Sequence, residues 1–330
     1  MIVKSMNKFG INLNEAFTRI EKKINETKLL EVNEINDKFG IRIFVKPECN
    51  QKTGSFKYRG ALNNISKLVS KKNISNLVCF SSGNHGKAVA AIANKFNLNS
   101  TIFMPDSAPK YKILNTRKYN GKVLLHKGTR SSMEKRAIDY AKNNNANLIK
   151  PFDDRDIIAG QGTIGIEICK EFIEKKLNLD AVLVPCSGGG LAAGIALAVK
   201  KSFPDAKIHP VEPMNFDDTT RSLLAGKILS NNKLIKQSIC DALLVPKPGK
   251  ITFSINKELL SYGITVSEDQ VIKAMQIGYH YFNLILEPGG AVGLAVLLKK
   301  QFNNKYKNIV IIASGGNISK ENHKSYMIKN

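Results

Sequence analysis

The stretch from residue 181 to residue 202, AVLVPCSGGGLAAGIALAVKKS, decides the fold class of this chain. It opens with Ala181–Pro185, an apolar, β-branched run with the length of a buried strand. A glycine turn follows, and Leu191–Ser202 then has a helical pattern. A strand that leads through a glycine turn directly into a helix is typical of βαβ units, so we predict an α/β protein with parallel strands.

The same alternation of short apolar runs and helical segments continues on both sides of this stretch. No repeat of fixed period and no low-complexity linker interrupts it. We predict further strands at Ile43–Val45, Asn76–Phe80, Ser100–Met104, Lys122–Leu125, Lys207–Val211 and Asn308–Ile312. We predict further helices at Lys87–Lys95, Arg130–Asn143 and Thr163–Lys176.

Length and composition limit the class of protein. The chain has 330 residues, 43% hydrophobic and 23% charged, which is ordinary for a soluble protein of one large or two compact domains. No apolar run reaches the roughly 18 residues of a membrane helix, and the first ten residues do not resemble a signal peptide. The five cysteines are scattered and form no CxxC pair, so we expect buried thiols. We therefore predict a cytoplasmic protein.

The formal net charge of +23 is the one unusual bulk property. Such a charge is typical of proteins that bind nucleic acids. The lysines are spread along the whole chain, however, and no stretch combines clustered arginines with aromatic residues. We therefore predict no nucleic-acid partner and no membrane partner, and we expect at most an attraction for anionic substrates.

Three glycine-rich turns follow predicted strands, at Ser81–Gly86, Ser187–Gly190 and Ser314–Gly316. In open α/β sheets, ligands bind beyond the carboxyl ends of the strands, so these turns predict one site built from several of them. The turn before Leu191–Ser202 combines a glycine backbone with the unpaired N–H groups of a helix N-terminus, which suits a phosphate. It lacks both the Walker ending and the GxGxxG spacing, so the phosphate is not that of a typical nucleotide.

The segment Ser55–Ala61, SFKYRGA, resembles the Schiff-base lysine motif of fold-type II pyridoxal-phosphate (PLP) enzymes, a group that includes threonine dehydratase and serine racemase. Further segments resemble other landmarks of this group, and their order matches over nearly the whole chain. They are Ser81–Gly86, the loop at the cofactor phenol oxygen and the substrate carboxylate; Ala159–Thr163; Ser187–Leu191, the phosphate loop; Glu287–Ala291; and Ser314–Asn317.

This resemblance implies the architecture in more detail. We expect two open, twisted, mostly parallel sheets flanked by helices, as in the β subunit of tryptophan synthase. Residues 1–75 and 154–330 would form a large PLP-binding domain, and residues 76–153 a small mobile domain. The resemblance also implies a homodimer.

The resemblance assigns roles to the motif residues. Lys57 would hold PLP as a Schiff base and take the α-proton of the substrate, with its pKa lowered by desolvation and nearby cationic charge. Ser82 would act as acid or base on the opposite face, or it would only anchor a helix start. The implied cofactor-binding residues are Phe56, Lys57, Asn84, Ser187, Gly188, Gly189, Gly190, Leu191, Glu287 and Ser314. The implied substrate-binding residues are Ser81, Ser82, Asn84, His85 and Arg130.

The implied reaction is removal of water and then ammonia from L-threonine or L-serine, which gives a 2-oxo acid. Ser314 would face the pyridine nitrogen of PLP. A neutral hydroxyl does not readily protonate that nitrogen, so the cofactor would be a weaker electron sink, and β-elimination is favoured over transamination. Serine racemase and 3-hydroxyaspartate dehydratase (ammonia-lyase) stay open as alternatives. Lys57 and the intact loops argue against a silent PLP-binding protein.

Two further features concern specificity and metal binding. Arg130 would pair with a second substrate carboxylate, which favours 3-hydroxyaspartate, or it would face solvent at a helix start. Relatives that bind a divalent cation have carboxylates at the positions of Glu212 and Asp218 and a backbone oxygen near Phe216. Oxygen ligands of this kind suit Mg²⁺ or another divalent cation. The alternative is a solvated acidic loop.

The chain departs from the group at three places. Glu26-Thr27-Lys28 replaces a common Arg-Thr-Pro, Asp241-Ala242 replaces Asp-Gly, and Ser187 replaces a fourth glycine of the phosphate loop. None of these changes removes the catalytic lysine. They leave the choice of substrate and the docking of the N-terminal segment open.

Overall fold

Ten strands form two sheets in the part of the chain that the computed structural model describes, residues 7–232, 237–299, 302 and 306–328. The larger sheet has the order β1-β2-β10-β7-β8-β9 and the smaller the order β5-β4-β3-β6. Neighbouring strands run parallel, except β1 and β2. The strands are β1 (Leu30–Glu31), β2 (Arg42–Lys46), β3 (Asn76–Phe80), β4 (Asn99–Pro105), β5 (Lys122–His126), β6 (Asn147–Leu148), β7 (Ala181–Pro185), β8 (Lys207–Pro213), β9 (Ile264–Val266) and β10 (Asn308–Ile312).

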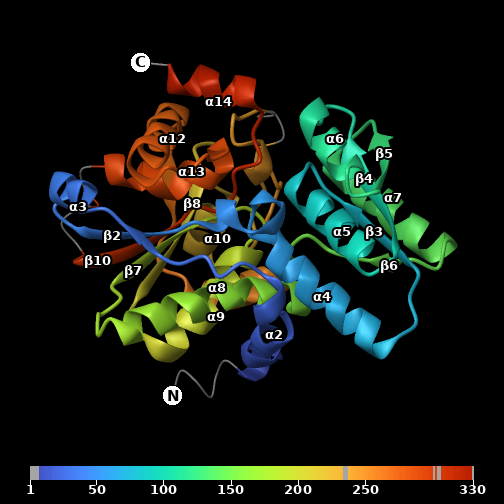
Figure 1. Ribbon diagram of the computed structural model, residues 1–330, viewed down its shortest axis with the longest axis horizontal. Helices are drawn as coiled ribbons and strands as arrows, with labels where there is room; N and C mark the ends of the chain where they lie inside the picture. The colour runs from blue at the N-terminus through green and yellow to red at the C-terminus, as the bar shows by residue number, and fades with distance from the viewer. Residues whose placement is uncertain (1–6, 233–236, 300–301, 303–305, 329–330) are drawn as a thin grey trace.

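Helices flank both sheets (Figure 1). The α-helices are α2 (Leu13–Ile20), α3 (Asn33–Phe39), α4 (Lys57–Lys71), α5 (Asn84–Lys95), α6 (Lys110–Arg117), α7 (Arg130–Asn143), α8 (Arg155–Glu174), α9 (Gly190–Ser202), α10 (Asp218–Ala225), α11 (Lys250–Leu259), α12 (Glu268–Phe282), α13 (Pro288–Ala295) and α14 (Lys320–Met327). Short 3₁₀ turns lie at Asn7–Phe9, Glu21–Lys23, Glu48–Asn50, Lys52–Gly54, Asp241–Leu243 and Val296–Leu298. None of the helices described is long and apolar enough to cross a membrane.

The larger sheet is covered on both faces because consecutive positions in its inner strands are apolar, at residues 43–45 of β2, 181–185 of β7 and 309–312 of β10. On β2, Ile43 and Val45 belong to the core beneath α12 and α13, whereas Phe44 belongs to the core beneath α8 and α9. On β7, Leu183 faces the first of these cores and Val182 the second. Side chains alternate between the faces of a strand, so continuous apolar runs bury both faces, as expected for parallel sheets. Figure 1 shows the two helix layers on opposite sides of this sheet.

The smaller sheet forms a second lobe from the chain between Asn76 and Leu148 (Figure 1). Helix α7 packs on one face through Met133, and α5 packs on the other through Ile92. Helix α4 joins the lobes, because Leu62 shares a core with α5 and with the start of α8. The fold class is confirmed. The domain boundaries at residues 75 and 153, and the mobility of the small domain, stay predictions.

The largest difference from the predicted elements is at the start of α8. We predicted a helix from Thr163, but α8 begins at Arg155, where the Asp154 carboxylate accepts the N–H groups of Asp156 and Ile157 at 2.9 Å. The glycines of the segment Ala159–Thr163 are therefore packing positions inside a helix. A Cβ on Gly160 would lie 2.6 Å from the Cα of Gly60 in α4, so α4 and α8 approach closely only because both carry glycine there.

Candidate active site

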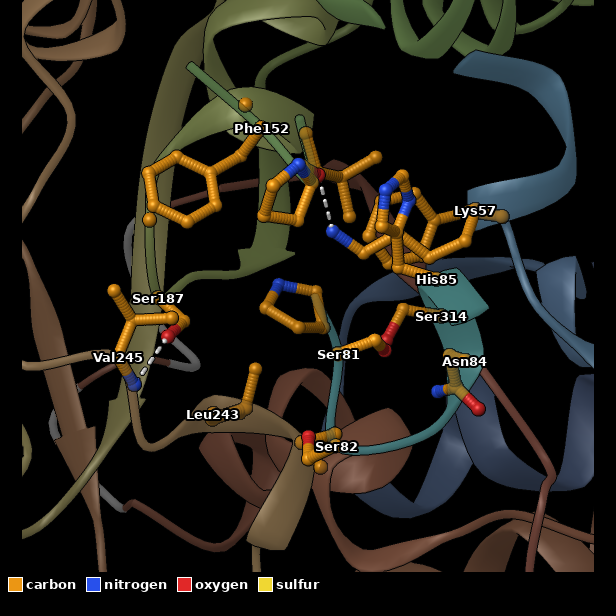
Figure 2. A pocket seen from close by; sticks show the side chains of 18 of the residues that line it. Lys57, Ser81, Ser82, Asn84, His85, Phe152, Ser187, Leu243, Val245 and Ser314 are labelled. Atoms are coloured by element: carbon orange, nitrogen blue, oxygen red, sulfur yellow. Dashed lines mark hydrogen bonds between the residues drawn. The ribbon is translucent and has the colours of Figure 1, made fainter. Parts of the chain in front are cut away.

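A cavity between the two sheets collects the residues that follow β3, β7 and β10 (Figure 2). It brings together every residue predicted to bind cofactor or substrate, namely Phe56, Lys57, Ser81, Ser82, Asn84, His85, Arg130, Ser187, Gly188, Gly189, Gly190, Leu191, Glu287 and Ser314. The predicted cation ligands Glu212, Phe216 and Asp218 lie outside this cavity. All five cysteines are buried free thiols, and none lines the cavity.

Lys57 is the first residue of α4, and its amine points into the cavity (Figure 2). The Nζ atom donates to the carbonyl oxygen of Pro151 at 2.7 Å and lies 5.1 Å from the ring centroid of Phe56. Burial, together with the charge of Arg130, lowers the pKa of Lys57 to about 7. A large share of the amine is therefore unprotonated near neutral pH, which a nucleophilic lysine requires.

A buried ion network fixes the first turn of α4. Arg59 is fully buried and donates to both oxygens of Glu48, at 2.8 and 2.9 Å, and to both oxygens of Glu167, at 2.6 and 2.8 Å. Two bidentate carboxylates on one planar guanidinium hold α4 against α8 and the segment after β2. Lys57 lies two residues before Arg59, so the network fixes the backbone from which the Lys57 side chain extends.

The glycine turn before α9 forms an anion cradle. Gly189 has a φ of +89°, and a Cβ there would lie 2.6 Å from the Nδ2 atom of Asn256. A Cβ on Gly188 would lie 2.5 Å from the ring of Phe152. Asn256 and Thr252 of α11 donate to the carbonyl oxygens of Gly189 and Gly188, at 3.2 and 2.7 Å. Helix α11 thus satisfies the carbonyl groups of the turn, and the N–H groups at the start of α9 suit an anion.

The loop before α5 offers donors for a carboxylate. His85 is buried, its Nε2 atom donates to the carbonyl oxygen of Ile149 at 2.9 Å, and burial next to Lys57 lowers its pKa to about 3. A neutral imidazole that donates from Nε2 has no second N–H. The Ser81 hydroxyl and the N–H groups at the start of α5 are therefore the better donors for a substrate carboxylate. Ser82 lies across the cavity from Lys57 (Figure 2).

Asn84 and Ser314 line the same part of the cavity, on the side away from Ser187 (Figure 2). The Asn84 amide nitrogen donates to Glu287, and its oxygen accepts from Asn317 at 2.8 Å. Burial raises the pKa of Glu287, while the charge of Lys112 opposes that rise. The carbonyl group of Ser314 accepts from the N–H of Phe56 at 3.1 Å, which connects the segment after β10 to the start of α4.

Arg130, the first residue of α7, lines the cavity from the small lobe. Its guanidinium carbon lies 5.7 Å from the ring centroid of Phe80, and burial lowers its pKa. It forms no hydrogen bond or ion pair with any residue that the structure describes. An arginine keeps its charge in such surroundings. The charge of Glu134 acts on Arg130 from the same helix, but the guanidinium has no hydrogen-bonded carboxylate partner among the described residues.

Glu212 and Asp218 form a buried pair of carboxyl groups beyond the cradle. Glu212 accepts from the N–H of Thr219 at 2.9 Å and from the N–H and hydroxyl of Thr220 at 2.7 Å. One oxygen of Asp218 accepts from Asn231 at 2.6 Å, and the other is buried without a partner among the described residues. Burial raises the pKa of Glu212 to about 7, and burial beside Glu212 raises that of Asp218 to about 8. The pair is therefore not a solvated acidic loop.

Several residues that line the cavity carried no recognised signal in the sequence. Pro151 and Phe152 follow β6, a strand of only two residues that was not predicted. A prediction of β6 would have placed these two residues at the carboxyl end of a strand, together with the other residues of the cavity. Val245 donates its N–H to the Ser187 hydroxyl at 3.2 Å (Figure 2). Lys112 lies in a helix with no distinguishing pattern, and no sequence signal separates it from the many surface lysines.

Comparison with known proteins assigns the chain to a family. The family model described as "Pyridoxal-phosphate dependent enzyme" matches residues 20–315. The chain is 37% identical to a serine racemase of Arabidopsis thaliana, with 93% of this chain and 92% of that protein covered. It is 36% identical to an L-threo-3-hydroxyaspartate ammonia-lyase of Saccharomyces cerevisiae, with 92% and 91% covered. The chain therefore belongs to the pyridoxal-phosphate dependent enzymes, in the group of threonine ammonia-lyases and serine racemases.

A solved structure supports the same assignment. The crystal structure of a threonine deaminase of T.th. superposes with a TM-score of 0.87 at 35% sequence identity, covering 93% of this chain and 97% of that chain. The predicted family and fold class are thus confirmed, and pyridoxal phosphate is the cofactor of this family.

Proposed function

We propose that this protein is an ammonia-lyase that removes water and then ammonia from L-threonine or L-serine and forms a 2-oxo acid. One observation carries the proposal. The Lys57 amine, with its lowered pKa, shares a cavity with the anion cradle of α9 and with the donors at the start of α5. Such a cavity suits a phosphorylated cofactor at one helix start and an amino-acid carboxylate at the other.

The residues present fit pyridoxal phosphate. Ser187 to Leu191 would hold the phosphate, because the turn accepts no side chain at Gly188 or Gly189. Asn84 would donate to the phenol oxygen, Ser314 would face the pyridine nitrogen, and Phe56 would pack on the ring. When bound, pyridoxal phosphate supplies a carbonyl that condenses with amines and a ring that accepts the electron pair of the α-carbon.

The chain's own residues then have distinct tasks. The Ser81 hydroxyl and the N–H groups at the start of α5 orient the substrate carboxylate. The Nζ atom of Lys57 takes the α-proton, for which a pKa near neutrality is suited. The β-hydroxyl leaves as water after protonation at the end of the cavity that Ser187 lines. Hydrolysis of the released product gives the 2-oxo acid and ammonia.

A second candidate is a 3-hydroxyaspartate ammonia-lyase, and Arg130 favours it. An unpaired guanidinium in the cavity would bind a second carboxylate bidentately, which threonine and serine lack. Ser82 favours serine racemase as a further alternative, because a hydroxyl across the cavity from Lys57 could return the proton from the opposite face. A homodimer and a cytoplasmic location remain predictions from sequence.

The test is an assay of the purified holoenzyme with L-threonine, L-serine, L-threo-3-hydroxyaspartate and its erythro isomer, measuring ammonia, 2-oxo acid and D-serine. We expect ammonia and 2-oxo acid in equal amounts from L-threonine and L-serine. Ammonia from a hydroxyaspartate alone would select the second candidate. Formation of D-serine without ammonia would overturn the lyase assignment.

A divalent cation at Glu212 and Asp218 is part of this proposal. The unpartnered Asp218 oxygen and the raised pKa values of both groups are what a cation-binding pair shows without its ion. Among the described residues, no group of three or more Asp, Glu, His or Cys side chains could hold a metal ion, so the Phe216 carbonyl and water would complete the ligands. Oxygen ligands alone suit Mg²⁺ or Ca²⁺.

We expect the cation-free protein to lose stability as the pH rises through about 7 to 8. A carboxyl group whose pKa is raised in the folded state stabilises the fold fully below its unfolded pKa, and this contribution is lost as pH rises through the folded pKa. In chelator, the melting temperature at about pH 9 should be at least a few degrees lower than at about pH 6. A loss of about 1 kcal/mol in the free energy of unfolding lowers the melting temperature by about 2–4 °C. Added Mg²⁺ or Ca²⁺ should restore it.

Asp218→Asn should remove the response to cation and the part of the pH dependence that comes from Asp218, whereas burial still raises the pKa of Glu212. Asp217→Asn is the matched control, because Asp217 is the neighbouring acid and pairs with Arg221 at 2.9 Å on the surface. If wild type and Asp218→Asn melt alike in chelator and in Mg²⁺ or Ca²⁺ across this pH range, the pair is no cation site.

A further inference from the structure

Lys112 lies in the small lobe but makes its ion pairs with the large lobe. It belongs to α6, and its side chain is 3% exposed. Its Nζ atom lies 2.6 Å from the carboxylate of Asp241 and 3.6 Å from the Oε2 atom of Glu287. Its stem crosses the loop before α5, where a Cβ on Gly83 would lie 2.6 Å from its Cδ. Lys112 therefore connects both lobes at the wall of the cavity.

Glu287 links Lys112 to Asn84. Its other oxygen, Oε1, accepts from the Asn84 amide nitrogen. The Asn84 amide oxygen accepts from Asn317 at 2.8 Å, and Asn317 in turn accepts from Lys87 at 2.7 Å. The amide of Asn84 is thus held from both ends, and its orientation is fixed. An amide nitrogen has two N–H groups, so one remains for a cofactor oxygen.

The ionisation state of Glu287 determines how strongly its carboxyl group holds the Asn84 amide. Glu287 is fully enclosed, and a carboxylate in such a place is kept ionised only by nearby cations. The cations that act on Glu287 are Lys112, whose amine is closest to it, and Lys87 on α5, while Asp241 acts against them. An ionised Glu287 accepts a stronger hydrogen bond from Asn84 than a protonated one does.

We propose that Lys112 is a positioning residue, which acts through Glu287 to fix the Asn84 amide for the phenol oxygen of the cofactor. The inference rests on the proposed function only in placing that oxygen at Asn84. Asp241 holds Lys112 from the large lobe, so the amide is fixed when the two lobes are together as in this structure. Lys112 of the small lobe thereby links the contact between the two lobes to the orientation of Asn84 at the cofactor site.

The experiment uses the PLP-loaded protein and the variants Lys112→Met, Lys112→Arg, Glu287→Gln and the double variant Lys112→Met with Glu287→Gln. Lys110→Met is the matched control, because Lys110 is an exposed lysine on the same helix. The measurements are the visible absorption spectrum of the bound cofactor from about pH 6 to pH 9, the cofactor dissociation constant, kcat and KM.

We expect Lys112→Met to change the pH dependence of the spectrum and to weaken cofactor binding by at least about tenfold, the size expected for one lost hydrogen bond to a charged group. The kcat value should fall while KM changes little. Lys112→Arg should retain most of the wild-type spectrum, and Lys110→Met all of it. In the Glu287→Gln background, Lys112→Met should add nothing, because its route of action is already removed.

Two results would overturn the inference. One is a Lys112→Met protein with the wild-type spectrum and cofactor affinity. The other is a full additional effect of Lys112→Met in the Glu287→Gln background, which would show that Lys112 acts elsewhere. If Lys112→Met does not fold, the Lys112→Arg protein still tests the inference. Because arginine keeps the positive charge, a Lys112→Arg protein without the wild-type spectrum would contradict a role that depends on charge. A wild-type protein without a cofactor spectrum would refute the proposed function instead.

Discussion

Lys57→Ala should abolish turnover with every substrate. A positioned general base contributes about 10²–10⁴-fold to a rate, and Lys57 would also carry the covalent link to the cofactor, so the loss should exceed about 10⁴-fold. The place of the Lys57 amine in the cavity supports both roles, and burial lowers its pKa, as both roles require. Lys57→Arg should fail equally, because a guanidinium is not deprotonated in proteins. The measurement is 2-oxo acid formation at saturating substrate.

Chemical trapping checks the same residue independently. Borohydride reduction of the wild-type holoenzyme should fix the cofactor on Lys57, and peptide mapping should recover it there. Lys71→Ala is the matched control, because Lys71 is an exposed lysine on the last turn of the same helix. It should leave turnover and trapping unchanged. Cofactor trapped on any other lysine would refute the assignment of the site.

Arg130→Ala should reduce kcat/KM for L-threo-3-hydroxyaspartate far more than for L-threonine. Loss of one partner of a buried, hydrogen-bonded charge pair costs about 2–5 kcal/mol, and about 1.4 kcal/mol is tenfold, so the loss should exceed tenfold for the dicarboxylate. Threonine has no second carboxylate, so its kcat/KM should change only slightly. The measurement is ammonia release under kcat/KM conditions for both substrates.

Arg136→Ala provides a closely matched control for Arg130. Both arginines lie on α7 and face the ring of a phenylalanine, Arg130 that of Phe80 at 5.7 Å and Arg136 that of Phe103 at 5.5 Å. Only Arg130 lines the cavity. Arg136→Ala should therefore leave the ratio of the two kcat/KM values unchanged. Equal losses on both substrates after Arg130→Ala would remove the arginine from substrate recognition and favour threonine and serine.

The fold class and the main site loops could be predicted from sequence because their signals are local. The run Ala181–Pro185 and the helix after it differ from the structure by at most one residue, since a continuous apolar strand and a glycine turn need no distant partner to be recognised. The cradle at Gly188 and Gly189 follows from the same local chemistry, and the SFKYRGA segment identified Lys57.

The structure was needed wherever a residue depends on distant neighbours. The start of α8 was missed because Gly160 permits contact with Gly60, a hundred residues earlier, and a glycine by itself indicates a turn. The hydrogen-bond partners of Arg59 are Glu48, Thr27 and Glu167, which come from three separate segments. No spacing in the sequence therefore predicts that they meet.

The sequence by itself determined the α/β fold class, and it predicted a phosphate cradle and a reactive lysine. Only the tertiary structure decided that Arg130 lines the cavity without a hydrogen-bonded partner among the described residues, that Pro151 accepts from the Lys57 amine, and that Lys112 pairs across the lobes. The physical reason is that strand and helix patterns arise from neighbours in the chain. Burial and charge pairing arise from groups that only folding brings together.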